Sequence, residues 1–354
     1  MGALMDGIDV EKVTDWMVTN TPPITPPLTF DLIAGGRSNL TYAVTDAVGR
    51  KVVLRRPPVS HVLASAHDMG REYRVISALQ DTNVPVPETY GYCDDPTVNG
   101  ASFYVMSFMD GYILRTLEDV EAAFPVEKRL AAGLDLADVL VDLHNVDPDE
   151  VGLGDLGKRE DYLGRQLKRW NSQFHASQDQ AREGGVFRPA EIVTQVHDQL
   201  VAMKPEQQRV SLAHADYRLD NCMYGADGKI IAVLDWELCT LGDPVADLAT
   251  MLMFWADRED EGAAIGAASA APGFPTRAEL IERYASKSDL DLSDLNYYIA
   301  FAHWRLACIL EGVFVRFATG AMADASEESV KSSVAMGNEV IRRSGLAQDL
   351  LAQK

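Results

Sequence analysis

The chain has 354 residues, of which 47% are hydrophobic and 24% charged, so it is long enough for two structural lobes with a sizeable core. Its formal net charge of -21 argues against nucleic acid and anionic membrane surfaces as partners, because both attract clustered Lys and Arg. The four cysteines are scattered and the N-terminus lacks signal-peptide features, so neither a disulfide framework nor secretion is indicated. We expect a soluble cytoplasmic protein without a membrane span; its oligomeric state is left unknown.

The first 110 residues favour strands. A short amphipathic helix over 9–19 precedes the extended, proline-rich segment 21–28, so residues 1–27 are interpreted as an N-terminal arm. Within 28–110 we predict a five-stranded antiparallel sheet with one helix after its third strand. The strand patterns cover 28–36, 39–50, 51–58, 88–95 and 102–110, and the helical pattern covers 64–79.

From Gly111 onward the pattern changes to long helices, and a glycine there can act as a hinge between lobes. One β-like passage interrupts the helices, with 221–225 and 230–236 forming a predicted hairpin around the turn 226–229. The fold class is therefore α+β, with a mainly helical lobe over 111–354. The predicted helices cover 126–145, 157–176, 189–203, 245–256, 275–287, 293–318 and 326–344.

The segment LAHADYRLDN, residues 212–221, carries the most suggestive polar cluster. His214, Asp216 and Asn221 have the His-x-Asp-x-x-x-x-Asn spacing of a kinase catalytic loop, where the Asp accepts a hydroxyl proton and the Asn binds magnesium. Taken alone, the segment is equally typical of a turn rich in capping residues. The hairpin that follows ends in Asp235, where kinases have a second metal-binding Asp. Hard oxygen ligands suit Mg²⁺, so we predict Asn221 and Asp235 as its ligands.

The N-terminal sheet supplies features that suit a nucleotide. A small-residue loop between the first two strands can place backbone N–H groups over phosphates, although two glycines also suit any hairpin. The loop residues assigned to nucleotide binding are Gly35, Gly36, Arg37, Ser38 and Asn39. Arg55 ends the third strand, where kinases keep a phosphate-binding lysine, and Glu72 on the next helix is its natural partner. The alternative is a solubilising pair on an edge strand beside a solvated helix face.

Several other polar residues have structural explanations. Asp243 fits a helix N-cap and Asp247 the first turn of that helix, so both are interpreted as bracing the catalytic loop. His144 ends an amphipathic helix, where its charge complements the helix dipole. Arg305, on a late helix, is assigned to core packing rather than a substrate pocket, and Asp220 to surface or capping duty.

In their order along the chain, these features resemble the aminoglycoside phosphotransferase family, which includes choline kinase-like enzymes and shares the protein kinase-like fold. The most specific part runs from LAHADYRLDN to LDWELCTLGDPVADLA, residues 212–249. The resemblance implies that Asp216 is the catalytic base and that His214 braces its loop. It also implies the magnesium ligands Asn221 and Asp235 and the phosphate-gripping pair Arg55 and Glu72. The hinge that holds adenine is represented by Met106, Ser107, Phe108 and Met109.

Two segments, VVLRRPP and REYRVISAL, are closer to the kinase-like domains found beside acyl-CoA dehydrogenases than to the antibiotic-resistance enzymes. That subgroup implies hydroxylated acyl acceptors, including CoA thioesters. The sequence departs from the family at Ala215, which replaces a glycine, and at Arg55, which replaces a lysine. Trp236 and Glu237 replace the Phe-Gly that follows the corresponding Asp in protein kinases.

We therefore predict transfer of the γ-phosphoryl group of ATP, with Mg²⁺, to a hydroxyl of a small molecule. One alternative is a pseudokinase-like regulator that binds nucleotide without catalysis. The other is a metal-dependent hydrolase with His214, Asp216 and Asp235 as ligands, which leaves Arg55 and Glu72 unexplained. The acceptor stays open, because net acidity favours an aminoglycoside-like cation and the subgroup resemblance favours an anionic acyl compound.

Overall fold

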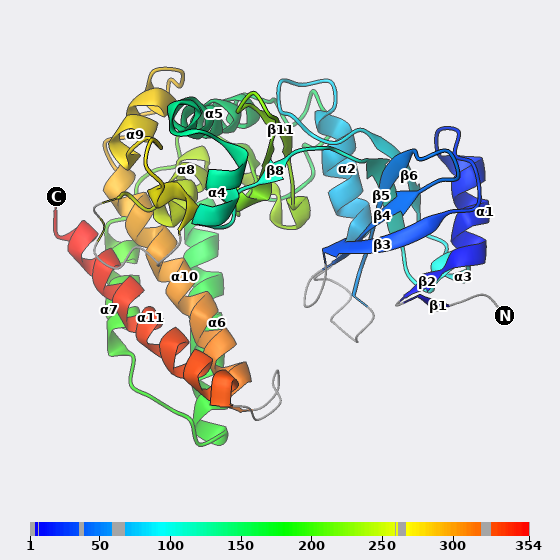
Figure 1. Ribbon diagram of the computed structural model, residues 1–354. Coiled ribbons are helices and arrows are strands. Elements are labelled where there is room, and N and C mark those ends of the chain that lie inside the picture. The colour runs from blue at the N-terminus through cyan, green and yellow to red at the C-terminus, as the bar shows by residue number, and fades with distance from the viewer. Residues whose placement is uncertain are drawn as a thin grey trace.

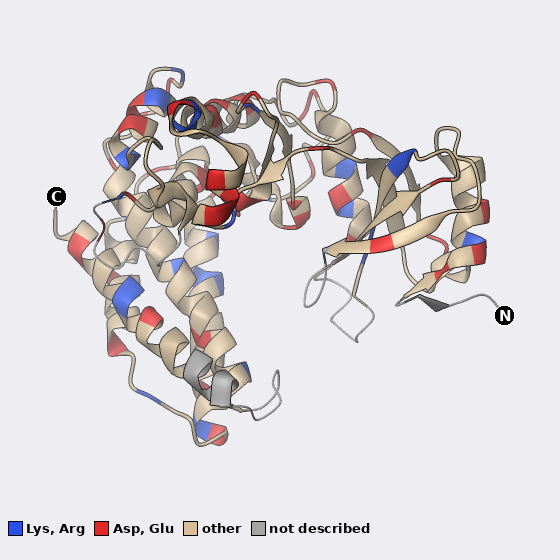
Figure 2. Cartoon of the chain, viewed as in Figure 1, with Lys and Arg blue, Asp and Glu red and all other residues tan. Residues whose placement is uncertain are grey.

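The computed structural model describes residues 4–5, 7–34, 39–58, 68–258, 260, 267–319 and 327–353. These residues form two lobes, with a sheet at one end of the molecule and a group of helices at the other (Figure 1). Acidic residues occur in both lobes (Figure 2). The predicted α+β, two-lobed architecture is confirmed.

The N-terminal lobe contains the predicted five-stranded sheet, in which every neighbouring pair is antiparallel and the strand order is β3-β4-β5-β7-β6. Its strands are β3 (Thr29–Ala34), β4 (Leu40–Thr45), β5 (Lys51–Arg56), β6 (Thr89–Cys93) and β7 (Phe103–Ser107). The helix α2 (Met69–Leu79) follows β5, as predicted, and Asp68 caps it by accepting a hydrogen bond from the N–H of Arg71.

Each face of this sheet is covered by a helix. On one face Val52 and Leu54 pack into the core that includes α1 (Val10–Asn20), so the segment predicted as an arm contributes to this lobe. On the other face Val53 packs with α2 and the C-terminal lobe. Side chains alternate along a strand, so Arg55 shares the face of Val53 and points towards α2 and the other lobe. The ribbon of β1 (Leu4–Met5) with β2 (Ile8–Asp9), and the short α3 (Pro96–Asn99), were not predicted.

The C-terminal lobe is mainly helical, and its long helices agree with the predicted ranges. The exceptions are α4, which was not predicted, α6, which begins five and ends seven residues later than predicted, and α11, which continues seven residues past its predicted end. Residues 147–161, before α6, form turns and loops. The helices are α4 (Leu117–Ala123), α5 (Val126–His144), α6 (Tyr162–Glu183), α7 (Glu191–Ala202), α8 (Pro244–Phe254), α9 (Arg277–Ala285), α10 (Leu295–Ala318) and α11 (Glu327–Leu351). Among the described residues, α10 is the one helix long and apolar enough to cross a membrane, and 61% of its apolar stretch is buried in the protein.

Two small sheets hold the segments that carry the candidate chemistry. The predicted hairpin is formed by β10 (Cys222–Tyr224) and β11 (Ile230–Val233), and β8 (Tyr112–Ile113) pairs with β10 at its side. A second pair, β9 (Ser211–Ala213) with β12 (Thr240–Gly242), was not predicted. Residues 214–221 therefore lie between β9 and β10, and Asp235 lies between β11 and β12. The short 3-10 turns η1 (Leu219–Asn221), η2 (Trp236–Leu238) and η3 (Ala268–Ala270) complete this region.

Candidate active site

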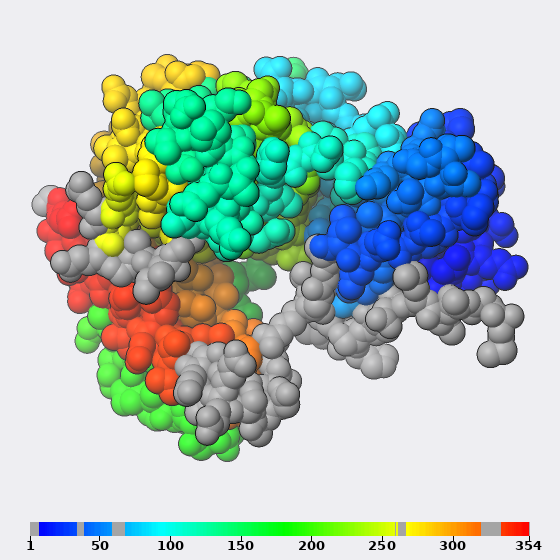
Figure 3. Space-filling model, in the orientation of Figure 1, coloured from blue at the N-terminus to red at the C-terminus, as the bar shows by residue number. Residues whose placement is uncertain are grey.

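A cleft of about 480 Å³ lies between the two lobes, a volume typical of small-molecule and cofactor sites. The sheet, the segment that links the lobes and the catalytic hairpin all contribute to its walls. The predicted site residues that line it are Asn39, Arg55, Glu72, Met106, Ser107, Phe108, Met109, Asn221 and Asp235. Gly35, Gly36, Arg37 and Ser38 lie outside the described residues. The space-filling view shows the molecule hollowed between the N-terminal lobe and the C-terminal helices (Figure 3).

Arg55 joins the two lobes through a pair of carboxylates. Its Nε donates to Glu72 Oε2 at 3.0 Å and its Nη2 donates to Asp235 Oδ1 at 2.6 Å. Burial disfavours the charge of this guanidinium, but the two carboxylates outweigh that effect and raise the pKa of Arg55, so it is a permanent cation. The edge-strand alternative is therefore wrong, since Arg55 is an inward-facing cation at the floor of the cleft.

His214 lies behind the catalytic loop and connects it to the strand that ends at Asp235. Its Nε2 lies 2.9 Å from the carbonyl oxygen of Leu234, so Nε2 carries the proton. Its Nδ1 consequently accepts the N–H of Asp216 at 3.3 Å. His214 is fully buried and does not line the cleft, so its contacts connect the two loops behind the site.

Asp216 is held by the asparagine five residues later. The Nδ2 of Asn221 donates to Asp216 Oδ2 and to the Asp216 carbonyl oxygen, both at 2.9 Å. Burial raises the pKa of Asp216, and the nearby Arg218 cation opposes that rise. Arg218 Nε lies 3.5 Å from Asp216 Oδ2 and 3.2 Å from Asp220 Oδ1. Asp220 is thus part of a charged group beside the catalytic loop, which corrects its assignment to surface or capping duty.

Buried Asp247 supports the catalytic loop from below, as predicted. Its two carboxylate oxygens accept the backbone N–H groups of His214 at 2.7 Å and Ala215 at 2.9 Å. Burial by itself raises the pKa of Asp247, but hydrogen bonds from His144 and His214 outweigh it and lower the pKa. His144 lies between Asp247 and Tyr284, whose hydroxyl is 2.7 Å from its Nδ1. His144 ends α5, as predicted, and it is also a buried member of this support, which the helix-dipole explanation did not include.

Ala215 adopts a conformation that suits glycine better. Its φ is +67°, in the left-handed region where a Cβ is unfavourable, so replacing the glycine of the family introduces backbone strain. Its carbonyl oxygen accepts a hydrogen bond from Arg305 Nη2 at 2.9 Å. Arg305 therefore supports the catalytic loop, which its assignment to core packing did not foresee.

Glu237 is a site residue that the sequence reasoning missed. Burial and then the neighbouring carboxylates of Asp235 and Glu72 raise its pKa to about 7. The amide Nδ2 of Asn39 lies 3.4 Å from Glu237 Oε2, so the end of the glycine-rich loop reaches the catalytic hairpin. The spacing Asp-Trp-Glu was the available signal, since a second carboxylate follows Asp235 by two residues.

The donor set fits a magnesium ion that is bound together with phosphates. Asn221 uses its Nδ2 on Asp216, which leaves Oδ1 as its metal-binding atom, and Asp235 supplies a carboxylate in the same cleft. Within the described residues there is no group of three or more His, Cys, Asp or Glu arranged to hold a metal. The remaining ligands would therefore come from water and from a nucleotide, as Mg²⁺ usually requires.

Comparison with known proteins identifies relatives over most of the chain. The model of a phosphotransferase enzyme family matches residues 29–280. Acyl-CoA dehydrogenase family member 10 of Mus musculus is 33% identical over 307 residues, which are 83% of this chain and 27% of that protein. The chain spans between 27% and 38% of the length of the curated relatives it matches.

Two solved structures give the fold. A Ralstonia eutropha protein, provisionally assigned as an aminoglycoside phosphotransferase, is 29% identical with a TM-score of 0.79, covering 96% of this chain and 98% of that one. An amicoumacin kinase has a TM-score of 0.57 at 16% identity, over 95% of this chain and 94% of that one, and shows the fold alone. The protein kinase-like fold is confirmed. The chain belongs to the phosphotransferase enzyme family, whose kinase-like enzymes transfer a phosphoryl group to a hydroxyl of a small molecule.

Proposed function

We propose that this chain is an ATP- and Mg²⁺-dependent kinase that phosphorylates a hydroxyl of a small molecule, with Asp216 as its base. The observation that carries the proposal is the convergence of Arg55, Asp235 and Asn221 in one cleft, with Asn221 hydrogen-bonded to Asp216. The amicoumacin kinase structure contains AMP-PNP and Ca²⁺, which supports an adenine nucleotide and a divalent cation here. We further propose that the enzyme acts in the cytoplasm without nucleic-acid or membrane partners, in line with its charge of -21.

Each side chain has a defined task in this reaction. Asp216 accepts the hydroxyl proton of the acceptor while the hydroxyl oxygen forms its bond to the γ-phosphorus, and ADP leaves. The amide of Asn221 fixes the rotation of the Asp216 carboxylate. Arg55 binds phosphate oxygens with the planar fork of its guanidinium. Asn221 and Asp235 would hold a magnesium ion, which would supply positive charge that offsets the phosphates.

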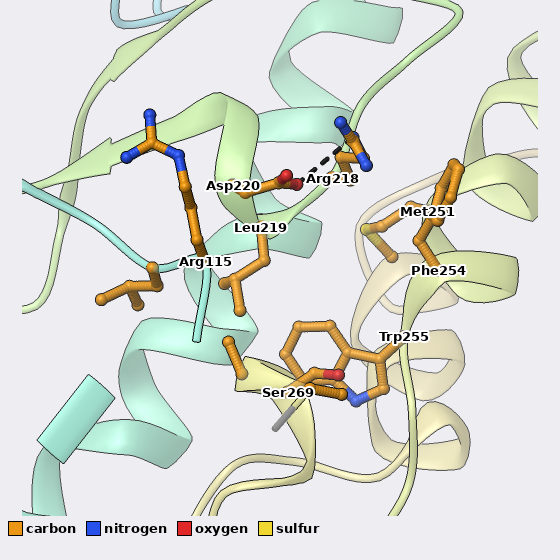
Figure 4. Close-up of a pocket in the computed structure, with 11 residues that line it drawn as sticks. Arg115, Arg218, Leu219, Asp220, Met251, Phe254, Trp255 and Ser269 are labelled. Atoms are coloured by element: carbon orange, nitrogen blue, oxygen red, sulfur yellow. Dashed lines mark ion pairs between the residues drawn. The ribbon is translucent and has the colours of Figure 1, made fainter. Parts of the chain in front are cut away.

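A second pocket, of about 140 Å³, lies beside the catalytic loop and suits part of the acceptor. Arg218, which contacts Asp216, forms one wall, and its guanidinium lies 5.0 Å from the ring centroid of Phe254. In Figure 4 the Arg218–Asp220 ion pair lies on one side of the pocket, while the guanidinium of Arg115 extends away from it. The apolar wall consists of Leu114, Leu219, Met251, Phe254, Trp255, Ala267 and Ala268.

These walls favour an acyl compound over a polycation as the acceptor. Apolar side chains take hydrocarbon. The Arg218 cation is already paired with the carboxylates of Asp216 and Asp220, so the choice rests on the apolar wall. The net charge of -21 describes the whole chain and has less bearing on one pocket. Relatives named as acyl-CoA dehydrogenases support the same choice. We therefore propose a hydroxylated acyl acceptor, with CoA thioesters as the first candidates.

ATP turnover against three acceptor classes tests this proposal. The purified chain is incubated with ATP, Mg²⁺ and a set of hydroxyacyl-CoA compounds, aminoglycosides or choline, and ADP and the phosphorylated product are measured. We expect turnover with hydroxyacyl compounds, which is lost in Asp216→Asn and kept in the matched control Asp198→Asn, an exposed residue on α7. Turnover with aminoglycosides alone would reject the acyl acceptor, and no turnover in any class would reject the kinase.

The same experiment separates the two rival functions. A pseudokinase-like regulator binds AMP-PNP and gives no product with any acceptor. A metal-dependent hydrolase acts without ATP, but both ring nitrogens of His214 are already engaged, with Leu234 and Asp216, so His214 is not available as a metal ligand. That geometry favours the kinase over the hydrolase.

A further inference from the structure

The two ion pairs of Arg55 differ in how easily each can be exchanged. Glu72 is buried, with 1% of its side chain exposed, so separating it from Arg55 would leave an uncompensated buried charge. Asp235 has 34% of its side chain exposed, so water can solvate its carboxylate if Arg55 moves away. The bond to Glu72 therefore anchors the guanidinium, and the bond to Asp235 is the one that a ligand can replace.

The carboxylate of Asp235 is a ligand for two cations, the Arg55 guanidinium and the proposed magnesium ion. Its Oδ1 lies 2.6 Å from Arg55 Nη2, and the same carboxylate is the one we assign to the magnesium ion. A divalent cation on this oxygen would lie a few ångströms from the guanidinium and be repelled by it, because like charges interact strongly in a partly buried site. Metal binding to the nucleotide-free protein therefore competes with Arg55.

We propose that Arg55 makes metal binding depend on nucleotide binding, an inference that rests on the proposed kinase function. The phosphates of the nucleotide draw Nη2 away from Asp235, which then becomes available to the metal, while Nε keeps its bond to Glu72. By thermodynamic linkage the metal strengthens nucleotide binding by the same factor. A guanidinium can do this because its nitrogens are separate donors, whereas the single nitrogen of a lysine cannot hold Glu72 and Asp235 in this geometry.

The test measures Mn²⁺ binding to the nucleotide-free protein by electron paramagnetic resonance. Arg55→Met removes the competing cation, and we expect it to bind Mn²⁺ about tenfold or more tightly than the wild type. Arg55→Lys, which keeps a partner for Glu72 and guards against failure to fold, is expected to bind several-fold more tightly. The matched control is Arg56→Lys, because Arg56 donates to the Pro57 carbonyl oxygen and lies on the opposite face of β5. Circular dichroism verifies that each variant is folded.

A second measurement uses nucleotide binding without metal. In EDTA, Asp235→Asn frees Arg55 for phosphates, so calorimetry should show ATP binding about fivefold or more tightly than to the wild type. With Mn²⁺ the order should reverse, because the metal ligand is lost. The gain in ATP affinity caused by Asp235→Asn in EDTA should be smaller in an Arg55→Lys background. If the gain came only from removing the negative charge of Asp235, it would be the same in both backgrounds.

The outcomes separate this inference from the proposed function. If the wild type binds and turns over ATP, but both Arg55 variants bind Mn²⁺ no more tightly than the wild type, the coupling by Arg55 is wrong and the kinase stands. If the wild type binds no nucleotide, both are wrong. An equal gain in Arg56→Lys would also overturn the inference, because it would show that the gain does not depend on the ion pair between Arg55 and Asp235.

Discussion

The loop that carries Asp216 and the cation of Arg55, to which we assign base and phosphate-binding roles, are held in different ways. The loop rests on Asp247, which is buried and accepts two backbone N–H groups within the C-terminal lobe. Arg55 is held by side-chain ion pairs to α2 and to the end of β11, in two different lobes. A buried carboxylate that bonds the backbone fixes the base before any ligand arrives, whereas an exchangeable ion pair can adjust to the ligand. In the proposed kinase, a rigidly held base would thus be combined with an adjustable phosphate-binding cation.

The largest expected effect on activity comes from changing Asp216 itself while leaving the contacts that hold the loop and Arg55 intact. Asp216→Asn keeps the shape and an oxygen for the amide of Asn221, but removes the proton acceptor. We expect kcat to fall about 10³-fold, since general base catalysis typically contributes 10²- to 10⁴-fold. Product formation under saturating ATP measures this, and thermal unfolding should be nearly unchanged. Near-full activity would show that the loop positions the acceptor without acting as its base.

The rigid support is broken most directly by Asp247→Asn. The amide oxygen of the new asparagine can accept a hydrogen bond from only one of the two backbone N–H groups, those of His214 and Ala215. Its NH₂ group, which is a donor, would face the other N–H group. Leaving a buried donor unpaired and removing the charge that faces His144 should lower the free energy of unfolding by about 2–4 kcal/mol. Urea denaturation measures this, with Asp198→Asn as the matched exposed control. A loss no larger than that of the control would mean that the loop is held mainly by other contacts.

Acid should weaken the packing of α10 around His303. His303 is buried on α10, the helix that also carries Arg305, and burial followed by the Arg343 and Arg342 charges lowers its pKa from an ordinary 6.5 to about 3. Because the unfolded chain binds this proton first, the contribution of His303 to stability is full above pH 6.5 and declines as pH falls towards 3, by about 1.4 kcal/mol per pH unit. A His303→Gln variant, compared by urea denaturation at pH 7 and pH 5, should lack this component. Equal pH dependence in both proteins would contradict the assignment.

The smallest effect concerns the strain within the catalytic loop. Ala215→Gly removes a Cβ from a residue with φ of +67°, so we expect stability to rise by about 0.5–1 kcal/mol. The same substitution at Ala213, which is buried in extended β9, should instead lower stability. Thermal unfolding of the two variants gives the comparison directly. If both changes destabilise equally, the left-handed conformation at Ala215 is not strained.

Local patterns predicted the elements and the position of Arg55 well. Alternation along β5 sends Arg55 to the face of Val53, and helical spacing brings Glu72 to meet it. The capping box of Thr116 and Asp119 was a usable signal for α4, which the prediction overlooked.

Contacts between distant segments could not be predicted in the same way. His144 meets Tyr284 across 140 positions and Asp247 across 103, and nothing in its own helix indicates either partner. The pairing of β9 with β12 joins strands of three residues each, which are too short for a periodic pattern. The alanine itself gives no indication of the left-handed φ of Ala215, and the one available signal was the glycine that the family has at this position.

The alternation of side chains along β5 also constrains the turn that precedes it. The register pairs Thr41 with Arg55, and the turn between β4 and β5 is closed by Asp46, which accepts the N–H groups of Val48 and Arg50. Inserting or deleting one residue in this turn would reverse the faces of β5. Arg56 would then take the place of Arg55 at the cleft, so a cation would still face the cleft. The apolar side chains that pack on α1 would turn to the other face of the sheet, and that packing would be lost. The length of this turn therefore matters more to the active site than its amino-acid composition.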